Sequence, residues 1–92
     1  MASRWRRRRM CVLLGDTPSP AALRSVSAAG AFVETNARLA LGQRVELHHP
    51  DAGAIGASVS GLASDGIELR FDRSSAAVAF ALAAIGADMC LR

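Results

Sequence analysis

The sequence predicts one mainly β domain, a small sandwich or barrel of about six short strands followed by a C-terminal helix. Its 92 residues allow a single domain. Apolar and polar residues alternate over several short stretches separated by glycine and proline turns, which is the pattern of half-buried strands. Near residue 74 the apolar spacing changes from two to about 3.6, which indicates a helix after the last strand.

The first three strands follow from apolar runs that turn residues interrupt. Met10–Leu14 is too short for a helix and ends at Gly15. Residues 17–20 contain two prolines and predict a turn before a second strand over residues 22–26. A third strand is expected over residues 31–34.

The last three strands show clearer alternation. Residues 44–48 alternate polar and apolar side chains, and residues 55–60 alternate apolar side chains with glycine and serine. A turn at residues 49–53 separates these two strands. The Ser-Asp-Gly sequence of residues 64–66 is a hairpin signal that leads into a strand over residues 67–71.

A helix is expected from Ser74 to about Met89, with Asp72 or Ser74 as its N-terminal cap. Alanines fill much of this segment and are the best helix formers. One face carries large apolar residues at spacings of four, three and four: Val78, Leu82, Ile85 and Met89. We expect this stripe to be buried against an open end or face of the barrel.

Positive charge is concentrated in residues 1–9, which hold five arginines and no acidic residue. We expect them to form a flexible basic arm in front of a β-barrel domain spanning residues 10–92. That domain holds six arginines against eight acidic residues, a net charge of −2. By itself the arm fits a solvated tail, a nucleic-acid contact, an anchor for anionic lipids or half of a nucleotide site.

Composition argues against several classes of function. Four aromatic residues are too few for the base-stacking platform of a single-strand nucleic-acid binder. No apolar run approaches the ~20 residues of a membrane span, and the run after the arginines is too short for a signal peptide. We therefore expect a cytoplasmic protein without stable membrane insertion. Cys11 and Cys90 lack metal or redox spacing and are interpreted as reduced core thiols.

No group of residues indicates catalysis. His48 and His49 are adjacent, so on a strand they point to opposite faces and do not readily share one metal ion. No Ser-His-Asp or Cys-His spacing occurs, and no glycine-rich phosphate loop precedes a helix. The prediction is a protein that is not an enzyme and that uses no metal or cofactor.

One serine-rich stretch offers binding chemistry. Ser25 and Ser27 precede Gly30, which stands at the entry to the third strand. A glycine there lets the backbone approach a ligand closely, and a nearby hydroxyl can hydrogen-bond to that ligand. A glycine bulge between two strands explains the same residues without a ligand.

Together with the arginines, this stretch resembles the PilZ domain family. Arg4 and Arg8 have the R-x-x-x-R spacing of that family, and Ser27 and Gly30 match the serine and glycine of its (D/N)-x-S-x-x-G motif. The resemblance extends over nearly the whole chain, with similarity to later strands of the family over residues 42–47, 55–59 and 65–71.

The resemblance implies a six-stranded antiparallel β-barrel with a C-terminal α-helix, and binding of the bacterial second messenger cyclic di-GMP. It assigns to Arg4 and Arg8 the clamping of phosphates and stacking on guanine, which suits guanidinium chemistry. It assigns further ligand contacts to Ser25, Ser27 and Gly30. Ser25 stands where the family has Asp or Asn, and one hydroxyl cannot accept from two guanine N–H groups at once. That difference corresponds to about 1–3 kcal/mol of binding free energy.

Two functions follow from the resemblance. The first is a cyclic di-GMP receptor whose arm folds over the ligand and which signals through an unidentified effector protein. The alternative is a degenerate PilZ domain that binds no nucleotide and acts as a protein–protein adaptor, which Ser25 favours and the retained motif residues oppose. Binding of nucleic acid or an anionic membrane through the arm is a third hypothesis with less support, and steep salt dependence would mark it.

Overall fold

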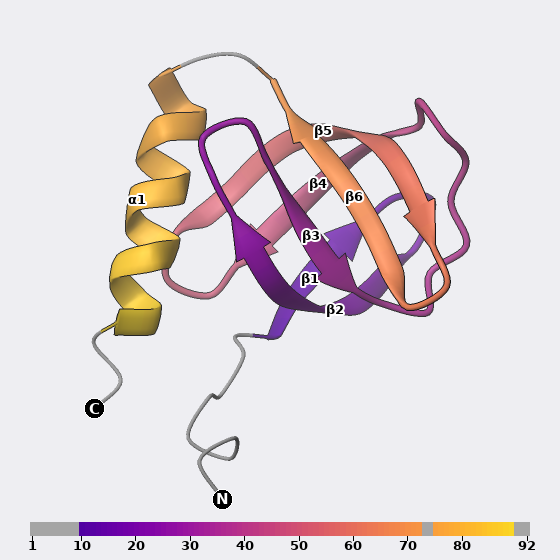
Figure 1. Cartoon of the computed structure of the whole chain (residues 1–92), viewed down its shortest axis with the longest axis horizontal. Helices are drawn as coiled ribbons and strands as arrows, with labels where there is room; N and C mark the ends of the chain where they lie inside the picture. Colours follow the sequence, from indigo (N-terminus) through magenta and orange to yellow (C-terminus); the bar gives the residue numbers. More distant parts are fainter. Residues whose placement is uncertain (1–9, 73–74, 90–92) are drawn as a thin grey trace, which may run out of the picture.

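The computed structural model describes residues 10–72 and 75–89, and over them it has the predicted fold, a closed barrel of six antiparallel strands with one C-terminal helix (Figure 1). Neighbouring strands follow the order β1-β2-β3-β6-β5-β4, and β4 closes the barrel by pairing with β1. The elements are β1 (Met10–Leu14), β2 (Pro18–Val26), β3 (Gly30–Glu34), β4 (Arg44–His49), β5 (Gly53–Ala63), β6 (Gly66–Phe71) and α1 (Ser75–Met89).

The turn predicted at residues 17–20 is wrong, because β2 already begins at Pro18 and pairs with β1 through both prolines. On its other side, β2 pairs with β3 only from Ala22 onward. The carbonyl of Pro20 faces that open side, where it accepts a hydrogen bond of 2.8 Å from the Thr35 hydroxyl. The nitrogen of a strand residue faces the same side as its carbonyl, so no ladder hydrogen bond is lost at Pro20.

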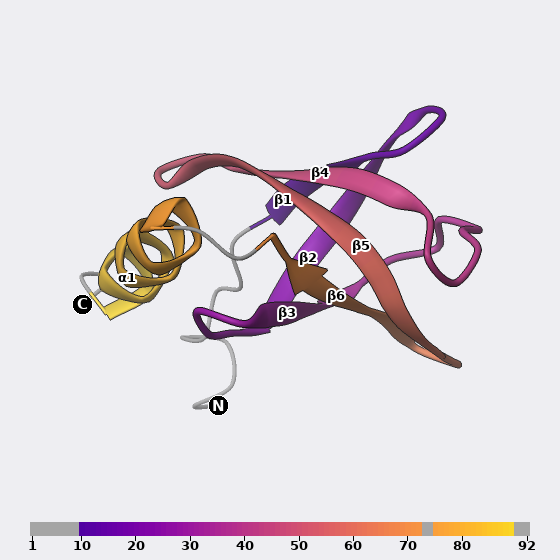
Figure 2. The ribbon, with the colours of Figure 1, turned by 90° about the horizontal axis from the view of Figure 1, so that it is seen from above.

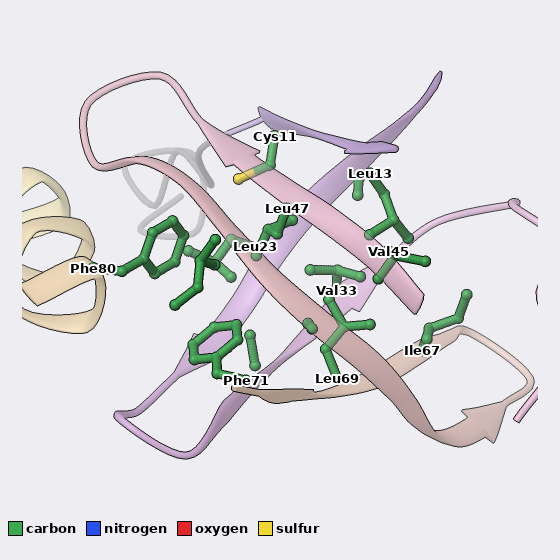
Figure 3. Close-up of a cluster of buried hydrophobic side chains, with 14 of the residues drawn as sticks. Cys11, Leu13, Leu23, Val33, Val45, Leu47, Ile67, Leu69, Phe71 and Phe80 are labelled. Carbon is green, nitrogen blue, oxygen red and sulfur yellow. The ribbon is translucent and has the colours of Figure 1, made fainter. Parts of the chain in front are cut away.

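Aliphatic side chains from alternate positions of every strand fill the barrel interior (Figure 3). Leu13 and Leu47 face each other across β1 and β4 and are fully buried. Cys11 is also fully buried in this core, as predicted. Cys90, the other predicted core cysteine, lies outside the described residues. The outward positions of the strands are therefore left to carry most of the polar side chains.

Helix α1 lies across one end of the barrel, against β2 and β5 (Figure 2). Its Phe80 is buried and lies beside Phe71 of β6 (Figure 3). The Phe80 ring packs edge-on against Phe71 and against His49 of β4, with ring centroids 5.4 Å and 6.0 Å away. The other buried side chains on the helix are small, namely Ala77, Ala81 and Ala84. A face with one ring among alanines lets the helix backbone approach the barrel closely.

The predicted buried stripe of α1 is wrong. Val78, Leu82 and Ile85 are 48%, 66% and 39% exposed, and the side chain of Met89 lies outside the described residues. The pattern of large apolar residues and the pattern of Phe80 with its alanines have the same helical spacing, so periodicity cannot choose between them. The barrel end decides the matter, because it accepts one ring and otherwise requires small side chains.

The two histidines point to opposite faces, as predicted. His48 is half-buried on the outer face, and its Nε2 lies 3.0 Å from the Glu46 carboxylate. His49 is buried, and its Nδ1 accepts hydrogen bonds from the backbone N–H groups of Asp51 and Ala52, at 3.0 Å and 3.1 Å. Its described contacts are those of a residue that fixes the β4–β5 turn.

Asp72, expected as a helix cap, instead holds the end of β6 to β4. Its carboxylate accepts two hydrogen bonds from the Arg44 guanidinium, at 2.6 Å and 2.7 Å. This bidentate contact lowers the pKa of Asp72. The other expected cap, Ser74, lies outside the described residues.

Candidate functional site

Three of the predicted site residues line one hollow on the outside of the barrel. Ser25, Ser27 and Gly30 come from the end of β2, the β2–β3 turn and the start of β3, and they border a space of about 420 Å³. We call it the serine hollow; its lining also includes Phe32 of β3, Ser60 of β5, and Glu68 and Arg70 of β6. The β2–β3 turn lies at the end of the barrel that α1 covers (Figures 1 and 2).

A β-bulge in β2 turns Ser25 outward. Leu23 is in register with Val33, but Ser25 is already in register with Phe32, so Arg24 is the extra residue. Simple alternation would follow buried Leu23 with outward Arg24 and inward Ser25. The bulge instead makes Arg24 and Ser25 successive exposed residues, which brings Ser25 to the hollow.

The β2–β3 turn is held by its own backbone and by Ser27. The Ser27 N–H donates to the Gly30 carbonyl at 2.8 Å, and the Ala29 N–H donates to the Ser27 hydroxyl oxygen at 3.2 Å. The Ala29 carbonyl accepts from the Phe71 N–H at 2.8 Å, which ties the turn to β6. Because a hydroxyl both donates and accepts, Ser27 can still donate its own proton to a ligand.

Gly30 is required by the barrel itself. A Cβ at this position would stand 2.0 Å from the carbonyl oxygen of Leu69 on β6, a distance that real Cβ atoms do not show. The sequence left open a ligand or a glycine bulge as the reason for this residue. Close packing of β3 against β6 accounts for the glycine instead, and the bulge lies at Arg24. Because Gly30 has no side chain and is in register with Arg70, the surface between Arg70 and the turn stays open.

Next to the serine hollow, Arg24 forms a cluster with two carboxylates, which we call the Arg24 cluster (Arg24, Glu34 and Asp65). Its Nε donates to Glu34 at 2.8 Å, and its Nη2 donates to Asp65. The guanidinium carbon lies 4.5 Å from the centre of the Phe32 ring, a cation–π contact. The hydrogen bond from Arg24 lowers the pKa of Asp65.

Sequence reasoning missed two charged residues of the serine hollow, Glu68 and Arg70, which we call the β6 pair. Both are exposed and point outward from β6. Neither side chain forms a hydrogen bond or an ion pair with any residue that the structure describes. The alternation of residues 67–71 in the sequence marks both positions as outward. It does not distinguish a ligand-binding surface from an ordinary solvent-exposed one.

Arg4 and Arg8, the two remaining predicted site residues, lie outside the described residues, as does the whole arm. The described chain begins at Met10, which is in register with Ala22 of β2. Ser25 follows Ala22 by three residues on that strand. The arm therefore joins the barrel beside the strand that carries the serines.

Chemically, the serine hollow combines hydroxyl groups and one guanidinium, which suit an anion, with one carboxylate, which suits N–H donors. Within residues 10–72 and 75–89, no three His, Cys, Asp or Glu side chains gather so as to hold a metal ion. Over the same residues, α1 is not long and apolar enough to cross a membrane.

Comparison with known proteins leaves the family open. No protein-family model matches the chain, and no match was found among curated proteins or among solved structures.

Proposed function

We propose that this chain is a PilZ-type domain that binds cyclic di-GMP in the serine hollow, with the arm arginines closing over the ligand. The observation that carries the proposal is the gathering of Ser25, Ser27 and Gly30 in one hollow with the guanidinium of Arg70, which has no partner among the residues that the structure describes. A hollow with a cation and hydroxyl donors suits the phosphates of a cyclic dinucleotide. The serine and glycine positions of the resemblance therefore lie in the same hollow as a guanidinium that the motif does not include.

The attachment point of the arm supports the same site. Met10 is the second residue after Arg8, so the two Cα atoms are at most ~7 Å apart. Ser25 is three strand residues beyond Ala22, the partner of Met10, which corresponds to ~10 Å along β2. An arginine side chain spans the remaining distance, and Arg4 has a longer reach. Both arm arginines can therefore contact a ligand in the serine hollow.

Isothermal titration of the full chain with cyclic di-GMP tests this proposal. We expect saturable binding that Arg8→Ala abolishes, because the family motif assigns a phosphate clamp to this guanidinium. Arg38→Ala is the matched control: Arg38 is exposed and lies in the β3–β4 connection, outside the lining of the serine hollow. Absence of heat from the unmodified chain, or equal loss of affinity in both variants, would contradict the proposal.

A second function, the adaptor without nucleotide, is favoured by an exposed apolar row on β1. Met10, Val12 and Leu14 are 59%, 43% and 37% exposed, and Val12 and Leu14 are in register with Pro20 and Pro18 of β2. Apolar side chains gathered on a strand surface are typical of protein-binding faces. This function predicts that Val12→Glu ends binding to the effector protein, whereas Arg8→Ala leaves that binding intact.

A further inference from the structure

The β6 pair stands out among the charged side chains of the barrel because its two members have opposite charge yet neither is paired within the described chain. Arg24 is bound to Glu34 and Asp65, Arg44 to Asp72, and His48 lies against Glu46. Glu68 and Arg70 are two residues apart on the same face of one strand, and both line the serine hollow. Of the charged side chains on the six strands, Glu68 and Arg70 are thus the two without a partner in the described chain, whereas Asp16 and Arg38, for which the same holds, lie in the connections between strands.

Glu68 lies in one row with Ser25 across three neighbouring strands. Ser25 is in register with Phe32 on β3, and Phe32 is in register with Glu68 on β6. Neighbouring strands are about 4.8 Å apart, so Ser25 and Glu68 flank Phe32 at a separation of ~10 Å. Ser25 stands where the PilZ family has Asp or Asn and so provides no carboxylate. Glu68 provides one on the opposite side of the same hollow.

Arg70 lies in the next outward row of the sheet. It is in register with Gly30 on one side and with Ser58 on the other. The missing side chain at Gly30 leaves the guanidinium open toward the β2–β3 turn, where Ser27 lies. On the other side, the Ser58 hydroxyl already accepts from Arg44 at 3.4 Å. The open side of Arg70 is the serine hollow.

A carboxylate and a guanidinium held two strand positions apart, each without a partner in the described chain, suit a ligand that has both a pair of N–H donors and an anionic group. Guanine nucleotides have this combination, because the guanine edge offers adjacent N1–H and N2–H groups to one carboxylate. Adenine offers an acceptor next to its amino group and cannot satisfy both carboxylate oxygens. The pair therefore distinguishes the two purines.

We propose that Glu68 reads the guanine edge of the bound nucleotide and that Arg70 binds its phosphate, so that β6 supplies the carboxylate that Ser25 lacks. This assignment rests on the proposed function for the identity of the site. It goes beyond that function because neither residue belongs to the motif that suggested the ligand. Glu68 and Arg70 determine specificity and affinity, and the barrel does not need them for folding.

Titration of the full chain with cyclic di-GMP and with cyclic di-AMP tests the assignment. We expect the unmodified chain to prefer cyclic di-GMP, and Glu68→Gln to weaken cyclic di-GMP binding about tenfold or more while leaving cyclic di-AMP binding unchanged. The double variant Ser25→Asp with Glu68→Gln is expected to regain affinity, because it returns a carboxylate to the hollow. Glu46→Gln, an exposed acidic position on β4, is the matched control and is expected to change neither affinity.

The outcomes separate the two proposals. No binding of cyclic di-GMP by the unmodified chain overturns both the proposed function and the assignment. Binding that Arg8→Ala abolishes but that Glu68→Gln and Arg70→Ala leave unchanged overturns the assignment alone. A thermal midpoint equal to that of the unmodified chain shows that each variant is folded, so that a loss of affinity reports on the ligand.

Discussion

Two groups of charged side chains lie next to each other on the outside of the barrel and differ in how their charges are neutralised. The Arg24 cluster joins one guanidinium to two carboxylates and lays it over Phe32. The β6 pair has one charge of each sign, and neither is bound to any part of the chain that the structure describes. Phe32 is common to both, since Arg24 lies over its ring and the residue also lines the serine hollow.

This difference separates charges that serve the fold from charges available to a ligand. The Arg24 cluster ties β2 to the end of β3 and to the β5–β6 turn, so its interactions are made within the chain. The β6 pair contributes no described side-chain tie between strands, and the role we propose for it in the hollow is contact with a ligand. Substitutions in the first group should therefore change stability, and substitutions in the second should change binding.

The largest expected effect is on stability and comes from Gly30, the glycine that packs against the Leu69 backbone beside the serine hollow. Gly30→Ala places a Cβ against the Leu69 backbone and should lower the free energy of unfolding by about 3 kcal/mol, because the strands must move apart. Gly86→Ala is the control: nothing lies within 4 Å of its Cβ, and in a helix the change should raise stability by about 0.5–1 kcal/mol. Urea denaturation followed by circular dichroism measures both, and an unchanged midpoint for Gly30→Ala would refute this packing argument.

A smaller effect is expected when Arg70 of the β6 pair and Arg24 of the Arg24 cluster are each replaced by alanine. Arg70→Ala should weaken cyclic di-GMP binding about tenfold and leave the thermal midpoint unchanged, since it removes a charge-assisted phosphate contact and no contact with the described chain. Arg24→Ala should lower the thermal midpoint, with a difference that shrinks at high salt because these ion pairs are exposed to solvent. If Arg70→Ala proved the more destabilising of the two, the distinction between the groups would fail.

The smallest effect is expected in acid. Arg24 lowers the pKa of Asp65, and Arg44 lowers that of Asp72, so the folded chain binds fewer protons than the unfolded chain near and below the ordinary aspartate value of 3.8. The stability that these carboxylates provide is complete above that value and is lost as the pH falls through the lowered values. Asp65→Asn should reduce the fall in thermal midpoint between pH about 6 and pH about 2. An identical fall in both proteins would show that the ion pair contributes nothing.

The strand pattern was readable from the sequence because each strand is buried on one side only. Alternation placed the positions of Leu47 and Leu69 inside and that of Arg70 outside, and the structure confirms this. The two prolines of β2 predicted a turn wrongly, because the sequence does not reveal which side of a strand lacks a neighbour. Pro20 is accommodated where β3 has not yet begun to pair.

Two features of the site and its surroundings could not be read from the sequence. The bulge at Arg24, which turns Ser25 outward, arises from the register between β2 and β3 and has no local signature. The buried face of α1 is set by the shape of the barrel end, which selected Phe80 with its neighbouring alanines over the larger side chains of Val78 and Leu82. Both are tertiary constraints that override local pattern.

The most direct test of the account is an NMR titration of the isotope-labelled full chain with cyclic di-GMP, following the backbone amides. We predict that changes in chemical shift concentrate at residues 25–32 and 68–70, around the serine hollow. The amide signals of Glu34 and Asp65 in the Arg24 cluster are expected to keep their chemical shifts. Shifts centred on Glu34 and Asp65, or no shifts at all, would contradict the claim that the unpaired charges of β6 form part of a nucleotide site.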